Sequence, residues 1–243
     1  MGDVGSLAPS PQAGKRASAL YLHIPFCSSK CLYCDFASWT TRSDDPLVAA
    51  YTMSVVEQVK AVSAAGLLEG CETAYVGGGT PSLLGDRLVT VVEAVVGEAH
   101  PLELTCEANP DSLDDELLDR LSSSGATRLS VGVQSTNDAE LRLLGRRHSA
   151  AEALSRLRAA VASGLAVSCD LMCATPGQSA KSWHRSLSDV VSSGVGHVSV
   201  YPLAIEEGTA LARIYEGDSC AFNDEDVEAE RMEQAEEFLL RNG

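Results

Sequence analysis

Two patterns of apolar and polar residues recur in turn along the chain. Short apolar runs predict strands, and stretches with apolar residues three and four positions apart predict amphipathic helices. Six runs predict strands, at residues 19–24, 73–76, 102–106, 128–133, 166–172 and 197–201. The helical pattern follows these runs, at residues 46–66, 83–96, 114–121, 139–144, 151–162, 182–191 and 224–240.

This order of elements predicts the fold class. Six strands that are each followed by a helix indicate parallel strands joined by right-handed crossovers. The short apolar character of the strands indicates a sheet covered by helices. We expect an α/β fold, a partial (β/α)6 TIM-like barrel, with its chemistry at the carboxyl ends of the strands. Residues 1–18 are rich in Gly, Pro, Ser and Ala and predict a disordered leader, followed by one domain at 19–243.

Composition limits the classes of function. The chain has 243 residues, of which 45% are hydrophobic, so it can bury a large core. Its net charge of −16 argues against a nucleic-acid surface, which needs a basic patch, and against tight binding to an anionic membrane. No apolar run reaches the ~18–20 residues of a transmembrane helix, and residues 1–18 lack the apolar core of a secretory signal. The cytoplasm is therefore the predicted location.

Cys27, Cys31 and Cys34 follow the first predicted strand with the spacing C-x3-C-x2-C. Sulfurs this close on one loop can converge on one centre, and an odd number of cysteines cannot pair off into disulfides. In a 4Fe-4S cluster held by these three cysteines, one iron would have no protein ligand and would be free to bind another molecule. A zinc site would need a fourth ligand, for which His23 is the nearest histidine, and unrelated buried cysteines are a further alternative. The spacing favours the 4Fe-4S cluster.

The same stretch resembles the radical S-adenosylmethionine (SAM) superfamily, whose hallmark is C-x3-C-x2-C on the loop after the first strand. With Tyr21 before the first cysteine and Tyr33 just before the third, it is similar to the branch of oxygen-independent coproporphyrinogen III oxidase and the haem chaperone HemW. The oxidase pattern has one more cysteine two residues after the third, where this chain has Phe36. The resemblance therefore favours a HemW-like haem chaperone built on a radical SAM barrel.

The resemblance also implies SAM contacts at the ends of the predicted strands. The glycine motif before Pro81 would hold the amino and carboxylate end of SAM, with a tight turn as the alternative. Arg146 would pair with the SAM carboxylate, or be a solvated charge. Glu107 would accept hydrogen bonds from ribose hydroxyls, or be a surface acid, and Asp170 would contact the adenosine side, or be a satisfied buried acid. The implied set is Tyr21, Tyr33, Gly78, Gly79, Thr80, Glu107, Gln134, Arg146 and Asp170. For the two tyrosines, packing in the core is the alternative.

Chemistry and partners are likewise implied by the resemblance. In this family a reduced cluster passes one electron to SAM, whose S–C5′ bond breaks to give methionine and a 5′-deoxyadenosyl radical. Haem or a porphyrin is the implied ligand, and a small acidic protein the implied electron donor. The candidate axial ligands for haem are His23, His100, His148, His184 and His197, among which the sequence does not choose.

Two features depart from the family pattern. Ala174 and Thr175 stand where relatives usually have Gly-Leu before the proline, and the chain stops at Gly243, where relatives continue into a C-terminal region with an H-N-x-x-Y-W signature. A C-terminal HemW-type domain is therefore expected to be absent. Three hypotheses follow: a HemW-like haem chaperone, a coproporphyrinogen III oxidase that makes protoporphyrinogen IX by oxidative decarboxylation, and an inactive truncated radical SAM core.

Overall fold

A computed structural model describes residues 16–216 and 224–242 of the chain. Six parallel strands form one sheet in the order β1-β4-β5-β6-β7-β8. These strands are β1 (Ala19–Ile24), β4 (Thr73–Gly78), β5 (Glu103–Ala108), β6 (Arg128–Gln134), β7 (Ala166–Cys173) and β8 (His197–Pro202). The predicted strands and the α/β class are confirmed, and the sheet is a partial barrel.

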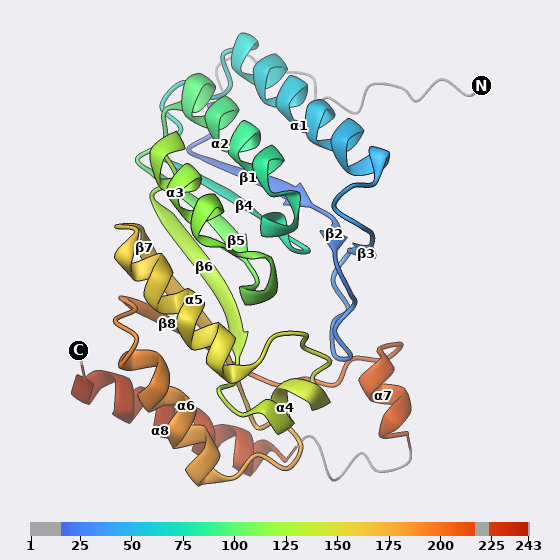
Figure 1. Cartoon of the computed structure of the whole chain (residues 1–243), viewed down its shortest axis with the longest axis vertical. Coiled ribbons are helices and arrows are strands. Elements are labelled where there is room, and N and C mark those ends of the chain that lie inside the picture. The colour runs from blue at the N-terminus through green and yellow to red at the C-terminus, as the bar shows by residue number, and fades with distance from the viewer. Residues whose placement is uncertain (1–15, 217–223, 243) are drawn as a thin grey trace.

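Helices connect the strands and follow one another along the outer side of the sheet (Figure 1). The longer ones are α1 (Pro46–Ala64), α2 (Asp86–Ala99), α3 (Asp115–Ser124), α5 (Ala150–Ala162), α6 (Ala180–Val191) and α8 (Glu225–Asn242). Their starts follow the capping rules: Asp45 accepts a hydrogen bond from the Leu47 N–H at the start of α1, and Ser149 forms a capping box with Glu152 at the start of α5.

Several short elements complete the fold. The helix α4 (Asp138–Leu143) lies close to its predicted position. The apolar pattern does not predict the ribbon of β2 (Phe26–Cys27) and β3 (Trp39–Thr40), the 3-10 turns η1 (Pro81–Leu84) and η2 (Pro110–Ser112), or the helix α7 (Ala210–Ile214). The physical reason is their length, because a periodic signal needs more residues than these elements contain.

The two faces of the sheet differ in polarity. Outer-face residues such as Leu104 and Val131 are fully buried in the core. Inner-face residues are mostly polar and line a cavity of about 650 Å3, among them Tyr75, Thr105, Glu107, Ser130, Ser168, Asp170 and Ser199. The expectation of a sheet covered by helices therefore holds for the outer face only. A sheet whose one face is packed and whose other face is hydrated alternates apolar and polar residues, as these strands do.

The predicted leader needs a small correction at its end. Residues 1–15 lie outside the described residues, but residues 16–18 have defined contacts. The Ala17 N–H donates to the Leu67 carbonyl, and the Ser18 carbonyl accepts from the N–H of Glu72. These bonds attach the start of β1 to the segment before β4. In the part of the chain that the structure describes, no helix is long and apolar enough to cross a membrane.

A small second core supports the region after β2. It consists of Leu144, Met172, Leu203 and Leu211, and Leu32 and Tyr33 of the cysteine loop pack against it. The loop between β2 and β3 is thereby held by the residue after α4, the end of β7, the residue after β8 and α7. The loop therefore depends on segments that are distant from it in the sequence.

Candidate functional site

Cys27 is the last residue of β2, and Cys31 and Cys34 lie on the loop that joins β2 and β3. All three are half-buried free thiols, and the Cys34 N–H donates to the Cys31 carbonyl at 3.2 Å. The Lys30 ammonium closes the loop by donating to the Phe36 carbonyl at 2.6 Å and to the Ser38 hydroxyl at 3.1 Å. The loop therefore presents three sulfurs from a backbone that its own side chains hold in shape.

The arrangement of these side chains does not match a zinc site. Across residues 16–216 and 224–242, no group of three or more His, Cys, Asp or Glu side chains is placed to hold one metal ion. His23 is also engaged: its Nε2 donates to the Ala37 carbonyl at 2.9 Å, and its Nδ1 accepts from Tyr21 at 3.1 Å. A cluster differs from a single ion because each cysteine binds a different iron, so the sulfurs need not converge on one point.

A guanidinium group stands beside the cysteines. Arg146 donates from Nη2 to the Asn109 side-chain oxygen at 2.7 Å and to the Gly132 carbonyl at 2.6 Å, and its Nη1 lies 3.5 Å from Cys31 Sγ. Among the described residues it makes no ion pair with a carboxylate. A partly buried cation without a counter-ion is costly, so the site suits an anionic group such as thiolates or a bound carboxylate.

The glycine stretch, which consists of Gly77, Gly78 and Gly79 at the end of β4, packs tightly against the cysteine loop. A Cβ atom on Gly79 would lie 2.6 Å from the Phe26 carbonyl oxygen and 3.0 Å from Cys27 Sγ, and one on Gly78 would lie 2.6 Å from the His23 ring. These contacts require glycine at both positions.

The protein uses the N–H groups of this stretch internally. Gly78 donates to Glu107 at 2.9 Å, and Gly79 and Thr80 donate to the carbonyls of Ile24 and Phe26, both at 2.7 Å. A ligand that bonds the backbone of this stretch would therefore have to donate to its carbonyl oxygens, as an ammonium group can.

Two carboxylates lie deeper on the inner face. Glu107 accepts from the Tyr75 hydroxyl at 2.7 Å as well as from Gly78, and burial raises its pKa despite these bonds. Asp170 accepts from Ser130 at 3.3 Å, and burial raises its pKa too, against the opposing effect of the Ser199 and Ser130 hydroxyls. The bonds from Tyr75 and Gly78 mean that Glu107 also holds the glycine stretch in place.

At the end of β6, Gln134 is buried and has a φ of 68°, next to a shift of register between Gly132 and Gln134. A non-glycine residue in this region of φ is uncommon, and such strain is concentrated at functional sites. The bulge turns the Gln134 side chain toward the cavity.

The predicted residues come together, with one exception. A single cavity of about 140 Å3 is lined by Cys27, Cys31, Tyr33, Cys34, Gly78, Gly79, Thr80, Glu107, Gln134, Arg146 and Asp170. Tyr21 is not in this lining. Its side chain is 57% exposed, and its ring stacks on Tyr75 at the edge of the sheet.

Sequence reasoning missed several residues of the same cavity, among them Lys30, Asn109, Ser130 and Gly132. Asn109 donates to the Thr80 hydroxyl at 3.1 Å and accepts from Arg146, so it links the glycine stretch to the guanidinium. Its place directly after β5, next to Pro110, is the signal that would have found it, because ligand groups gather after the carboxyl ends of parallel strands.

Comparison with known proteins agrees with this geometry. The Radical SAM superfamily matches residues 21–190. The chain belongs to this superfamily. As a radical SAM protein it is expected to hold a 4Fe-4S cluster and SAM, which the three thiols, the guanidinium without a counter-ion and the carbonyl-lined glycine stretch fit.

Two relatives and one solved structure are similar over nearly the whole chain. The heme chaperone HemW of Mycobacterium tuberculosis is 37% identical over 247 aligned residues, which cover 99% of this chain and 63% of that protein. The mitochondrial radical S-adenosyl methionine domain-containing protein 1 of Bos taurus is 36% identical, over 96% of this chain and 54% of that protein.

The structure of coproporphyrinogen III oxidase (HemN) from Escherichia coli superposes with a TM-score of 0.79 at 25% identity, over 94% of this chain and 54% of that one. The radical SAM chain described here thus spans between half and two thirds of the length of these relatives.

Proposed function

We propose that this chain is the radical SAM part of a HemW-type haem chaperone. The observation that carries the proposal is the 37% identity to a heme chaperone over 99% of the chain. The position two residues after the third cysteine supports it, because Phe36 stands where the oxidase pattern has a fourth cysteine. Phe36 lines the cavity and is 66% exposed, which leaves its ring open to contact with a flat apolar ligand.

In this proposal the three cysteines hold the cluster, and the cavity lined by the predicted site residues holds SAM. When bound, the cluster supplies one electron for reductive cleavage of SAM. The Gly78 and Gly79 carbonyls would accept from the SAM ammonium, and Arg146 would neutralise its carboxylate or the thiolates. Gln134 and Asp170 would orient the adenosine. The donor of the electron is an external protein, and haem or a porphyrin is the ligand that is carried. A reducing compartment such as the cytoplasm suits the free thiols.

The alternative is a coproporphyrinogen III oxidase, which the match to HemN favours. The lining of the larger cavity argues against it, because Asp35, Glu103, Glu107, Asp170 and Glu206 face a single basic residue, Arg128. A tetracarboxylate substrate would meet like charges there. A dicarboxylate such as haem is repelled less.

The test is anaerobic reconstitution with iron and sulfide, followed by EPR with and without SAM and by haem titration. We expect a 4Fe-4S signal that changes when SAM is added and is absent from the Cys31→Ala variant, together with a Soret band that saturates near one haem per chain. A cluster signal that ignores SAM, or no stoichiometric haem binding, would contradict the proposal. Formation of protoporphyrinogen IX from coproporphyrinogen III would favour the oxidase instead.

A further inference from the structure

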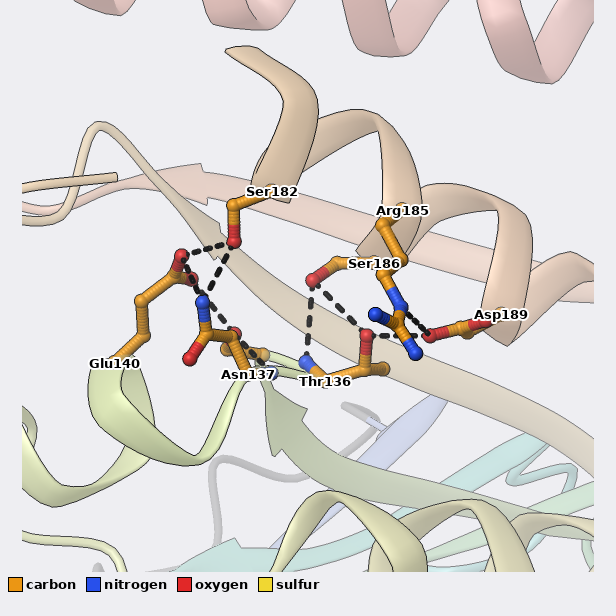
Figure 2. Close-up of polar contacts among 8 residues, drawn as sticks. Thr136, Asn137, Glu140, Ser182, Arg185, Ser186 and Asp189 are labelled. Carbon is orange, nitrogen blue, oxygen red and sulfur yellow. Dashed lines mark hydrogen bonds and ion pairs between the residues drawn. The ribbon is translucent and has the colours of Figure 1, made fainter. Parts of the chain in front are cut away.

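A buried polar network lies beside α4, outside the cavity that the predicted site residues line. Figure 2 shows Glu140 of α4 facing Ser182 of α6, with Asn137 between them and Thr136 next to Ser186 and Asp189. Radical SAM chemistry as described above assigns no task to these residues. Their contacts join the loop after β6 and the adjoining α4 to α6, which is more distant in the sequence.

Glu140 is the centre of this network and is only 5% exposed. Its Oε2 accepts from the Ser135 hydroxyl at 2.7 Å and from the Gln178 side-chain amide at 3.0 Å. Its Oε1 accepts from the Ser182 hydroxyl and, at 3.3 Å, from the Asn137 side-chain amide. No basic residue pairs with it in the part of the chain that the structure describes. The carboxylate is held by neutral donors alone.

This arrangement restricts where α4 can lie. A buried carboxylate is tolerated only while hydrogen-bond donors surround it, and a hydrogen bond to a charged group is stronger than one between neutral groups. The donors come from α6 and from the segment after β7 as well as from the adjacent loop. Any displacement of α4 from α6 would leave the charge buried and short of donors.

The other end of α4 supports the cysteine loop. The Leu144 carbonyl, directly after α4, accepts from the Leu32 N–H at 3.0 Å. Gly145 has a φ of 73°, and a Cβ atom there would lie 2.8 Å from Leu32 Cγ and 2.9 Å from Leu32 N. Leu32 lies between two of the cysteines, and its own carbonyl accepts from Leu211 at 2.7 Å. The position of α4 therefore sets the position of the loop at Leu32.

We propose that Glu140 is a positioning residue for the cysteine loop: its carboxylate fixes α4 against α6, and α4 in turn fixes Leu32 and the neighbouring thiols. Because Gln178 also accepts from the Ala174 N–H at 2.9 Å, the same carboxylate joins the loop after β7 to the cysteine loop. The proposal rests on the cluster site proposed above, but its first test needs neither cluster nor SAM.

The experiment measures hydrogen exchange of peptides covering residues 28–36 in metal-free Glu140→Gln and parent protein. An amide at position 140 would place N–H groups against the NH2 group of either Gln178 or Asn137. Neither side chain can turn its oxygen toward position 140 without losing a bond, because the Gln178 oxygen accepts from the Ala174 N–H and the Asn137 oxygen accepts from the Ala139 N–H. We expect exchange in 28–36 to be about tenfold faster, as for loss of one hydrogen bond to a charged group. Ser182→Ala, which removes one donor and leaves the charge, should give a smaller change in the same peptides.

Two comparisons separate positioning from general stability. The double variant Glu140→Gln with Gln178→Glu reverses the sense of the hydrogen bond between the two side chains and should restore part of the protection of 28–36, since the bond from Gln178 to the Met172 carbonyl at 3.3 Å is lost. Leu121→Ala opens a cavity at a fully buried position of α3 and should lower stability without selective exchange in 28–36.

In the reconstituted protein, Glu140→Gln should weaken SAM binding, measured by equilibrium dialysis, at unchanged iron content.

Unchanged exchange of 28–36 in Glu140→Gln would overturn the proposal, as would faster exchange spread equally over the whole chain. Equal selective acceleration in Leu121→Ala would overturn it as well. A failure of the cluster to form in the parent protein would instead count against the proposed function and leave the exchange result standing.

Discussion

Two non-glycine residues at the carboxyl ends of neighbouring strands have a positive φ angle. They are Gln134, the last residue of β6, with a φ of 68°, and Ala174, directly after β7, with a φ of 55°. Ala174 is the position where the family resemblance expects glycine, and its left-handed backbone explains that expectation, because glycine alone adopts it without steric cost. Gln134 has a side chain in the cavity, so the strain there coincides with a predicted ligand contact.

His148 is a buried histidine near the site. Its Nε2 donates to the Val133 carbonyl at 3.2 Å, and its Nδ1 has no partner among the described residues. Burial lowers the pKa of His148 to about 4, and the nearby Arg146 adds to this effect, while Asp111 and Asp138 oppose it. The side chain is therefore neutral in the folded protein at neutral pH.

This shift predicts a loss of stability in mild acid. The folded pKa lies below the unfolded one, so between roughly pH 6.5 and pH 4 the unfolded chain takes up a proton that the folded chain does not. The stabilising contribution is complete above this window and declines as the pH falls through it. From pH 7 to pH 5, His148 should cost the folded state on the order of 2 kcal/mol of unfolding free energy.

Urea unfolding at the two pH values, with and without His148→Gln, measures this contribution. Glutamine keeps a donor for Val133 and does not titrate, so the variant should lose less stability than the parent between pH 7 and pH 5. Equal losses in both proteins would show that other groups cause the acid sensitivity.

At the scale of elements, the glycine stretch at the end of β4 and the ribbon of β2 and β3 form one packed unit. The backbone bonds from Gly79 and Thr80 to Ile24 and Phe26 join them, and the Thr80 hydroxyl lies 3.6 Å from Cys27 Sγ. These contacts join the cysteine loop to a segment some fifty residues away in the sequence. A substitution in the glycine stretch should therefore alter the cysteine loop.

Gly79→Ala tests this dependence. A Cβ atom 2.6 Å from the Phe26 carbonyl oxygen cannot be accommodated without moving backbone, so we expect a loss of about 1–3 kcal/mol in unfolding free energy and a low iron content after reconstitution. Iron and sulfide per chain, together with urea unfolding, give the two readouts.

The matched control is Gly97→Ala, in the exposed last turn of α2, where an added Cβ meets nothing within 4 Å. Alanine should stabilise this helix by at most about 1 kcal/mol and leave iron content unchanged. If Gly79→Ala bound as much iron as Gly97→Ala, the packing of the glycine stretch would not govern the cysteine loop.

For the whole molecule, charge and shape act together. The net charge is −16, and the inner face of the sheet presents acidic residues to a cavity of about 650 Å3 with one arginine among its lining. Most TIM-type barrels fill this space with branched apolar side chains. A polar, acidic interior instead leaves room for a ligand and sets which charge that ligand can carry.

The acidic interior predicts discrimination between porphyrins. Binding of the tetracarboxylate coproporphyrin III should be weaker than binding of the dicarboxylate protoporphyrin IX, and should strengthen several-fold as salt rises from about 0.05 M to about 0.5 M, because screening weakens the repulsion. Fluorescence titration at both salt concentrations measures this.

Removing one acid from the lining should act like added salt. Glu206→Gln is expected to strengthen coproporphyrin III binding at low salt, whereas Glu93→Gln, on the outer helix α2, should leave it unchanged. A coproporphyrin affinity that falls with salt would contradict the role of the acidic lining and favour the oxidase.

The sequence by itself determined the features that depend on near neighbours in the chain. The alternation of strands and helices, the cysteine spacing, the strand ends at Glu107 and Gln134 and the place of Asp170 inside an apolar strand are all local, because periodicity, capping and turn residues act over a few positions. Since parallel strands end at one side of a sheet, this local information also predicted that these residues gather near the cysteines.

Only the tertiary structure decided the features that depend on contacts between distant segments. Tyr21 lies on the edge strand β1 and stacks on Tyr75, its partner in the neighbouring strand, which places it outside the cavity. Because the helices pack on one face of the sheet alone, the polar residues of the other face line a cavity. The roles of Asn109 and Glu140 arise from partners far away in the chain. Such contacts follow from register and packing, which no local pattern of residues encodes.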